Sequence, residues 1–101
     1  MATVIVRYKV KSEMADENID YITAVFDALR RTTPDDIRYT SMVADDGVSF
    51  THIASIESAE GSNPLLEMDE FQAFIADIGA RCEEAPSPVA QTVLGSYRVF
   101  D

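Results

Sequence analysis

The chain has 101 residues and a formal net charge of −10, with 47% apolar and 26% charged residues. This length and composition predict one globular domain spanning residues 1–101. The acidity argues against a nucleic-acid partner and against docking on anionic membranes, since both need clustered lysine and arginine side chains. A single cysteine and a single histidine are too few for a disulfide within the chain or an ordinary zinc site. We therefore predict no metal site. With no signal peptide visible, we expect a cytoplasmic location.

The first third of the chain predicts a strand and then a helix. Residues Thr3–Lys11 alternate in polarity and are rich in β-branched side chains, which is typical of a strand. From Ser12 to Arg31, apolar residues recur at helical spacing, with acidic residues first and arginines last. Ser12 is the expected N-cap of this helix, and the sequence TPDD at 33–36 is expected to end it.

The middle of the chain predicts a β-hairpin. Asp46-Gly47 lies between two alternating segments, Ile37–Asp45 and Val48–Glu57, and Asp-Gly is a strong signal for a two-residue turn. A turn there fixes the register and gathers the apolar residues on one face. The expected cross-strand pairs are Val43 with Phe50, Ser41 with His52, Tyr39 with Ala54, and Ile37 with Ile56.

The last third predicts a second helix and a final strand. Asn63-Pro64 is an expected N-cap followed by proline at the first helical position. The longer helix is expected over Glu70–Cys82, followed by a linker at Glu83–Pro88 and a strand at Val89–Phe100. The resulting order β-α-β-β-α-β predicts a ferredoxin-like α+β fold. This is a four-stranded antiparallel sheet with two helices on one face and the first and third strands in its centre.

Three stretches resemble the antibiotic-biosynthesis-monooxygenase-like group of the dimeric α/β-barrel superfamily. They are the opening VIVRYKVK, the hairpin end THIASIE, and NPLLEMDEFQAF with its break before an F-Q-x-F helix. The resemblance implies a homodimer whose two sheets pack face to face as a barrel, with a pocket in each subunit between sheet and helices. It implies that the barrel is lined by Ile5, Thr40, Met42, Thr51, Ile53 and Leu94. The apolar set facing the pocket would be Val6, Tyr8, Tyr39, Ser41, Phe50 and His52.

The resemblance also bears on activity. In the haem-degrading branch of the superfamily, an Asn, a Trp and a His ligand form the site. Here Val6 stands at the Asn position, Ile75 stands at about the His position, and the chain has no Trp. The cofactor-free members oxidise polycyclic aromatic phenols or quinols, so the resemblance implies a cofactor-independent monooxygenase-like protein for a small aromatic compound. The alternatives are a non-catalytic dimer that binds a small molecule or is structural, and an isomerase on the same fold.

His52 is the candidate catalytic residue. It is the only histidine and lies in the middle of an apolar strand face. As a general base it would take a proton from an activated phenol or enol, leaving an anion that reacts with O2. Ser41, directly across the hairpin, would hold one ring nitrogen and set the tautomer. The alternative is a neutral core histidine that is satisfied by Ser41 or by a backbone carbonyl.

The aromatic residues near His52 are candidates for binding the substrate. Tyr8 and Tyr39 would stack on an aromatic ligand and donate hydrogen bonds to it, or would only lie at the rim of the core. Phe71 and Phe74 would line the pocket or only pack along a helical stripe. The predicted substrate-binding residues are Tyr8, Tyr39, Ser41, Phe50, Phe71 and Phe74.

Overall fold

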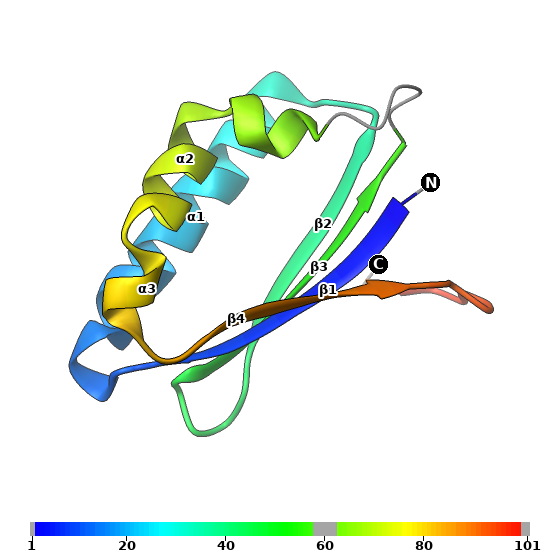
Figure 1. The fold of residues 1–101 in the computed structure, drawn as a ribbon. Helices are drawn as coiled ribbons and strands as arrows, with labels where there is room; N and C mark the ends of the chain where they lie inside the picture. Colours follow the sequence, from blue (N-terminus) through cyan, green and yellow to red (C-terminus); the bar gives the residue numbers. More distant parts are fainter. Residues whose placement is uncertain (1, 58–62, 100–101) are drawn as a thin grey trace.

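The computed structural model describes residues 2–57 and 63–99. Its elements are β1 (Ala2–Val10), η1 (Ser12–Met14), α1 (Ala15–Thr32), β2 (Ile37–Val43), β3 (Ser49–Ile56), η2 (Pro64–Glu67), α2 (Asp69–Ala76), α3 (Ile78–Arg81) and β4 (Cys82–Gln91). The strands form one antiparallel sheet in the order β2-β3-β1-β4, and the helices lie together over one of its faces (Figure 1). None of the helices in the described residues is long and apolar enough to cross a membrane. The predicted ferredoxin-like α+β fold is confirmed, with β1 and β3 in the centre.

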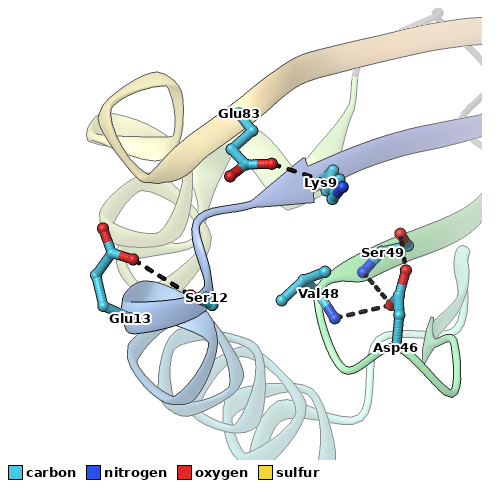
Figure 2. A network of polar contacts seen from close by, with 7 residues as sticks. All are labelled: Lys9, Ser12, Glu13, Asp46, Val48, Ser49 and Glu83. Carbon is cyan, nitrogen blue, oxygen red and sulfur yellow. Dashed lines mark hydrogen bonds and ion pairs between the residues drawn. The ribbon is translucent and has the colours of Figure 1, made fainter.

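The hairpin register is confirmed, although its turn differs from the prediction. Ser41 lies opposite His52, as expected. The strands end at Val43 and resume at Ser49, so residues 44–48 form a longer loop than the two-residue turn expected at Asp46-Gly47. The Asp46 carboxylate accepts hydrogen bonds from the main-chain N–H groups of Val48 and Ser49 and from the Ser49 hydroxyl (Figure 2). A short polar side chain thus organises the loop that aligns the two strands.

The first helix occupies the predicted region but begins differently. Ser12 is not its N-cap, because it is the first residue of the 3-10 turn η1, whose N-cap is Lys11. The α-helix itself starts at Ala15 and has no capping side chain. It ends as expected before Pro34, with Thr33 in the left-handed conformation at φ 45°.

The predictions for the end of the chain were wrong about the last strand. Of the predicted strand Val89–Phe100, only residues 89–91 lie in β4, which spans Cys82–Gln91, and Phe100 lies outside the described residues. The predicted linker Glu83–Pro88 is part of the strand, and residues 92–99 lie beyond it. β4 pairs only with β1 and is an edge strand, the place in a sheet where prolines are tolerated because one row of backbone groups has no neighbour. The register shift beside Arg7 and Lys9 further accommodates this irregular strand.

The predicted helix over residues 70–82 is interrupted. It divides into α2 and α3 at Asp77, whose backbone leaves the helical conformation at φ −120° and ψ 22°. Cys82, predicted as the last residue of that helix, instead begins β4 and pairs with Val10. Arg81, the last residue of α3, is 1% exposed and lies in helical phase with the buried Phe74.

The core lies between the sheet and the helices. Its buried cluster consists of Tyr8, Val10, Val25, Phe50 and Phe74, which come from β1, α1, β3 and α2. Residues that face each other across the strand pairs share this side of the sheet, including Val6 with His52 and Tyr8 with Phe50. The predicted apolar strand face is therefore the one that the helices cover.

The loop between β2 and β3 provides a test of the backbone conformation. Gly47 has φ 77°, where a side chain is strained, although a Cβ added there meets no atom within 4 Å. Gly47→Ala should lower the free energy of unfolding by about 1 kcal/mol through backbone strain alone. Gly79→Ala is the matched control, because Gly79 is helical and equally uncrowded, and it should be neutral or stabilising by up to about 1 kcal/mol. Urea unfolding of both variants measures the difference, and equal effects would contradict this account of the loop.

Candidate functional site

His52 lies in β3 at the centre of the helix-covered face and is 4% exposed. The Tyr8 hydroxyl lies 2.7 Å from Nε2 of its ring. On the other side, Nδ1 lies 2.6 Å from Ser41 Oγ and 2.9 Å from the Tyr39 hydroxyl. The rings of Tyr8 and Tyr39 also stack on the imidazole, with centroids 5.3 Å and 5.7 Å away. The structure therefore brings together four of the predicted site residues.

Three phenylalanines complete the surroundings of this group. Phe50 stacks on Tyr8 with centroids 5.5 Å apart, and Phe74 lies 5.4 Å from the His52 ring. Phe71 meets the edge of Tyr39 at 6.2 Å and also packs against Phe74. Phe50 and Phe74 are buried, so their contact with a ligand remains a prediction, whereas the packing of Phe74 on the imidazole and of Phe50 on Tyr8 is observed.

Burial keeps these groups neutral. It lowers the pKa of His52 from 6.5 to about 4, because a charged imidazolium would lose its hydration. Burial also raises the pKa of Tyr39 to about 12, and it raises that of Tyr8 despite the hydrogen bond from Asn18. At neutral pH the site consists of a neutral imidazole and two protonated phenols.

The hydrogen-bonded group extends to two residues that the sequence analysis missed. Asn18 of α1 is fully buried and donates from Nδ2 to the Tyr8 hydroxyl oxygen at 2.9 Å. Arg81 of α3 donates from Nε to Asn18 Oδ1 at 3.1 Å and from its terminal nitrogen to the main-chain oxygen of Phe74. The Arg81 guanidinium also lies 4.5 Å from the centroid of the Tyr21 ring. A continuous polar chain thus runs from α3 through α1 and β1 to β3 and β2.

The sequence carried a signal for both missed residues. Asn18 lies at helical spacing from Ile22 and Val25 on the inner face of α1. Arg81 is likewise in helical phase with Phe74 and Ile78. A polar residue on an otherwise apolar stripe needs a buried partner, and this pattern could have identified both positions.

A groove lies between α1 and β2, beside this group. It has a volume of about 490 Å³ and is lined by Ile22, Thr23, Phe26, Arg30, Tyr39, Thr40 and Ser41. A second hollow of about 220 Å³ shares Phe26, Arg30 and Tyr39 with it and continues toward Pro34. His52 lines neither hollow. Tyr39 and Ser41 are therefore the two residues that both face the groove and contact the imidazole.

The other potentially reactive side chains in the described residues do not form a second candidate site. In the described part of the chain, no three His, Cys, Asp or Glu side chains come close enough to hold a metal ion. Burial raises the pKa of Cys82, which leaves its thiol less reactive than a free cysteine. The candidate site is therefore the groove with the hydrogen-bonded residues behind it.

Comparison with known proteins places the fold. No protein-family model and no curated protein matches the sequence. Among solved structures, an antibiotic biosynthesis monooxygenase matches with a TM-score of 0.76 at 15% identity, over 94% of this chain and 100% of its own. SnoaB, a cofactor-independent oxygenase from Streptomyces nogalater, matches with 0.68 at 15% identity over 97% of each chain. Rv0793 from Mycobacterium tuberculosis matches with 0.70 at 15% identity, over 94% of this chain and 96% of its own.

The chain has the antibiotic-biosynthesis-monooxygenase fold. The expected resemblance is thus confirmed for the architecture, over nearly the whole chain. At this level of identity the likeness concerns the fold alone. The roles of the residues in the groove have to be argued from their own geometry.

The low pKa of His52 makes stability depend on pH in a defined direction. His52 has an ordinary pKa of 6.5 in the unfolded chain and a pKa of about 4 in the folded chain. As the pH falls, the unfolded chain therefore binds a proton at His52 at a higher pH than the folded chain does. The contribution of His52 is therefore complete above pH 6.5 and is lost as the pH falls toward 4, amounting to about 2 kcal/mol by pH 5. Urea unfolding of wild type and His52→Gln from pH 7.5 to 4.5 should show a difference in pH dependence of this size. Parallel curves would show that the imidazole titrates normally in the folded protein.

Proposed function

We propose that this chain is a cofactor-independent monooxygenase-like protein that acts on a small aromatic phenol or quinol-type compound. The compound would lie in the groove between α1 and β2, with its oxygen against the hydroxyls of Ser41 and Tyr39. One observation carries this proposal: the Ser41 hydroxyl lines the groove and lies 2.6 Å from the buried His52 ring. A surface hollow is thereby connected to a desolvated titratable group, a combination typical of functional sites.

The groove suits an aromatic ligand. Phe26 and Tyr39, whose rings stack with centroids 5.3 Å apart, form part of its wall, and Ile22 adds aliphatic surface. Its volume of about 490 Å³ falls within the range of small-molecule sites. Arg30, which lies 5.9 Å from the centroid of Phe26 and 3.6 Å from the Asp27 carboxylate, adds a guanidinium that would donate to an ionised phenol.

The reaction needs no external reductant. A phenol with a C–H para to its hydroxyl, once ionised, can add O2 and a proton at that carbon to form a hydroperoxide. Loss of water from the hydroperoxide then breaks the O–O bond and leaves a quinone carbonyl. The overall change is phenol plus O2 to quinone plus water, and the substrate supplies all four electrons that reduce O2. The protein has to bind the ring, stabilise the anion and exclude bulk water.

The part played by His52 depends on which ring nitrogen carries its proton. If Nδ1 is unprotonated, it can accept the substrate proton through Ser41 and act as a general base. If Nδ1 is protonated, it donates to Ser41, and Ser41 in turn donates to the substrate oxygen. In both cases Ser41 touches the substrate, while His52 acts from behind it.

Oxygen uptake tests the proposal. With a panel of polycyclic phenols that have a free para C–H, wild type should consume one O2 for each quinone formed and release no hydrogen peroxide. Ser41→Ala should lower kcat/KM by about 100-fold, because it removes a preorganised hydrogen-bonding group at the reacting oxygen. Ser12→Ala, at an exposed serine in η1, is the matched control and should be unchanged. Binding of the phenols without oxygen uptake would favour the non-catalytic alternative, and turnover under nitrogen would favour an isomerase.

We further propose that the chain forms a homodimer through the sheet face opposite the helices, as the predicted α/β barrel requires. This face carries apolar side chains that the single chain leaves partly open, including Met42, at 36% exposed, and Val89, at 53%. Leu94 and Tyr97, beyond β4, are 97% and 83% exposed. An apolar surface of this kind is normally covered by a partner.

Sedimentation velocity tests the dimer. Wild type should sediment as a dimer at micromolar concentration. Leu94→Lys should weaken the dimer at least about tenfold, because it would bury a charge in the interface. It should leave the fold intact, since this side chain contacts little in the single chain. Leu66→Lys is the control, because Leu66 is also exposed but lies in η2 on the helix side. A wild type that remains monomeric would contradict the barrel.

A further inference from the structure

We infer that Asn18 and Arg81 are positioning residues that fix the tautomer of His52, so that the groove presents a hydrogen-bond donor to the ligand oxygen. The assignment of the His52 tautomer concerns the protein without a ligand and does not depend on the proposed function. The consequence for the ligand rests on the proposed function, since it assumes that the groove is the binding site. Neither residue lines the groove, and both are buried at 1% exposure or less.

The direction of the hydrogen bonds is set first at Arg81. A guanidinium can only donate, so the group that faces its Nε must be an acceptor. The Asn18 side chain therefore turns Oδ1 toward Arg81, at 3.1 Å. Its Nδ2 then faces the Tyr8 hydroxyl oxygen, at 2.9 Å, and an amide nitrogen can only donate. The orientation of a buried amide, which usually has two choices, is fixed here by a permanent cation.

Tyr8 passes this direction to His52. Its oxygen accepts the hydrogen bond from Asn18, so its own hydrogen is available for His52 Nε2, at 2.7 Å. Nε2 must then be the unprotonated nitrogen of the neutral ring, and the ring proton resides on Nδ1. In the opposite tautomer, with the ring proton on Nε2, both Asn18 and His52 would donate to the Tyr8 oxygen. The Tyr8 hydrogen would have no acceptor among the described residues that contact its oxygen.

The chain of hydrogen bonds ends at the groove. With its proton on Nδ1, His52 donates to Ser41 Oγ at 2.6 Å and faces the Tyr39 oxygen at 2.9 Å. The ring nitrogen carries one hydrogen, and Ser41, at the shorter distance, accepts it and keeps its own hydrogen to donate to the Tyr39 oxygen or to a ligand. Both residues line the groove, so a ligand there meets a hydroxyl donor at the end of a hydrogen-bonded chain that begins at a buried cation. Such a site binds an anionic oxygen, as in a phenolate or enolate, in preference to a neutral hydroxyl.

Nitrogen NMR of the His52 ring tests the tautomer directly, because protonated and unprotonated ring nitrogens have distinct chemical shifts. Since His52 is the only histidine, the spectrum contains one ring. In the wild type without ligand at pH 7, the Nδ1–H form should exceed the Nε2–H form by about tenfold or more, because the reverse leaves a buried donor unpaired. A spectrum dominated by Nε2–H would overturn the inference.

Asn18→Asp is the decisive variant, because it is isosteric and removes the donor that faces Tyr8. The introduced carboxylate, held ionised by Arg81, can only accept, so the Tyr8 hydroxyl should turn to donate to it. His52 should then protonate on Nε2, reversing the tautomer ratio. Asn63→Asp is the matched control, with the same change of charge at a helix N-cap where aspartate serves equally well, and should keep the wild-type spectrum.

A second variant keeps the test decisive if Asn18→Asp does not fold. Tyr8→Phe removes the hydroxyl that accepts from Asn18 and donates to His52 Nε2. The preference for Nδ1–H should therefore fall by about tenfold. A folded Asn18→Asp or Tyr8→Phe with the wild-type ratio would show that Asn18 does not set the tautomer.

The ligand preference is tested with 4-nitrophenol, whose visible absorption distinguishes phenolate from phenol. Wild type should bind the phenolate about tenfold more tightly than the phenol, since a charge-assisted hydrogen bond is the stronger of the two. A folded Asn18→Asp should lose this preference. No binding of either form, with the wild-type tautomer confirmed, would count against the proposed site and leave the tautomer assignment standing. Preference for the neutral phenol would overturn the donor role.

Discussion

A buried positive charge without a carboxylate partner constrains the rest of this structure. Arg81 is 1% exposed and forms no ion pair among the described residues; its charge faces the Asn18 amide oxygen, a main-chain carbonyl and two aromatic rings. Leaving a buried charge uncompensated costs roughly 3–5 kcal/mol, so each of these groups has to keep its orientation. Arg81 lies on the inner face of α3, and its hydrogen bond fixes the Asn18 amide, which in turn donates to Tyr8 in β1.

Alternation and turn chemistry account for most of what the sequence predicted. The hairpin register followed from apolar residues on alternate positions, because a slip by one residue would have turned His52 and Phe50 toward the opposite face. The same reasoning placed the last strand too late in the chain, because it began the strand at Val89 and β4 spans Cys82–Gln91. The prolines at positions 86 and 88 suggested a linker. In the structure, residues 82–91 pair with β1 as an edge strand, a position in a sheet where prolines are tolerated. Local signals could not reveal this long-range pairing.

The candidate site was predicted in part. The sequence indicated the residues that share a sheet face, Tyr8, Tyr39, Ser41 and His52, because strand periodicity and register determine which side chains meet. It did not indicate the contribution of the helices, since the rotation and depth of a helix over a sheet depend on packing. Asn18 and Arg81 therefore remained hidden, although each interrupts an apolar stripe.

The energetics favour anion stabilisation over proton abstraction at this site. A base whose conjugate acid has a pKa of about 4 would take a proton from an ordinary phenol, of pKa about 10, at a cost of about 8 kcal/mol. Burial creates this cost, because it destabilises the imidazolium that general-base catalysis would form. The same burial shields the hydrogen bonds behind Ser41 from water, so that they polarise the hydroxyl that the groove offers to a negative oxygen. The best substrates would then be phenols or enols conjugated to a carbonyl group, which already ionise near neutral pH and need only to be held as anions while O2 reacts.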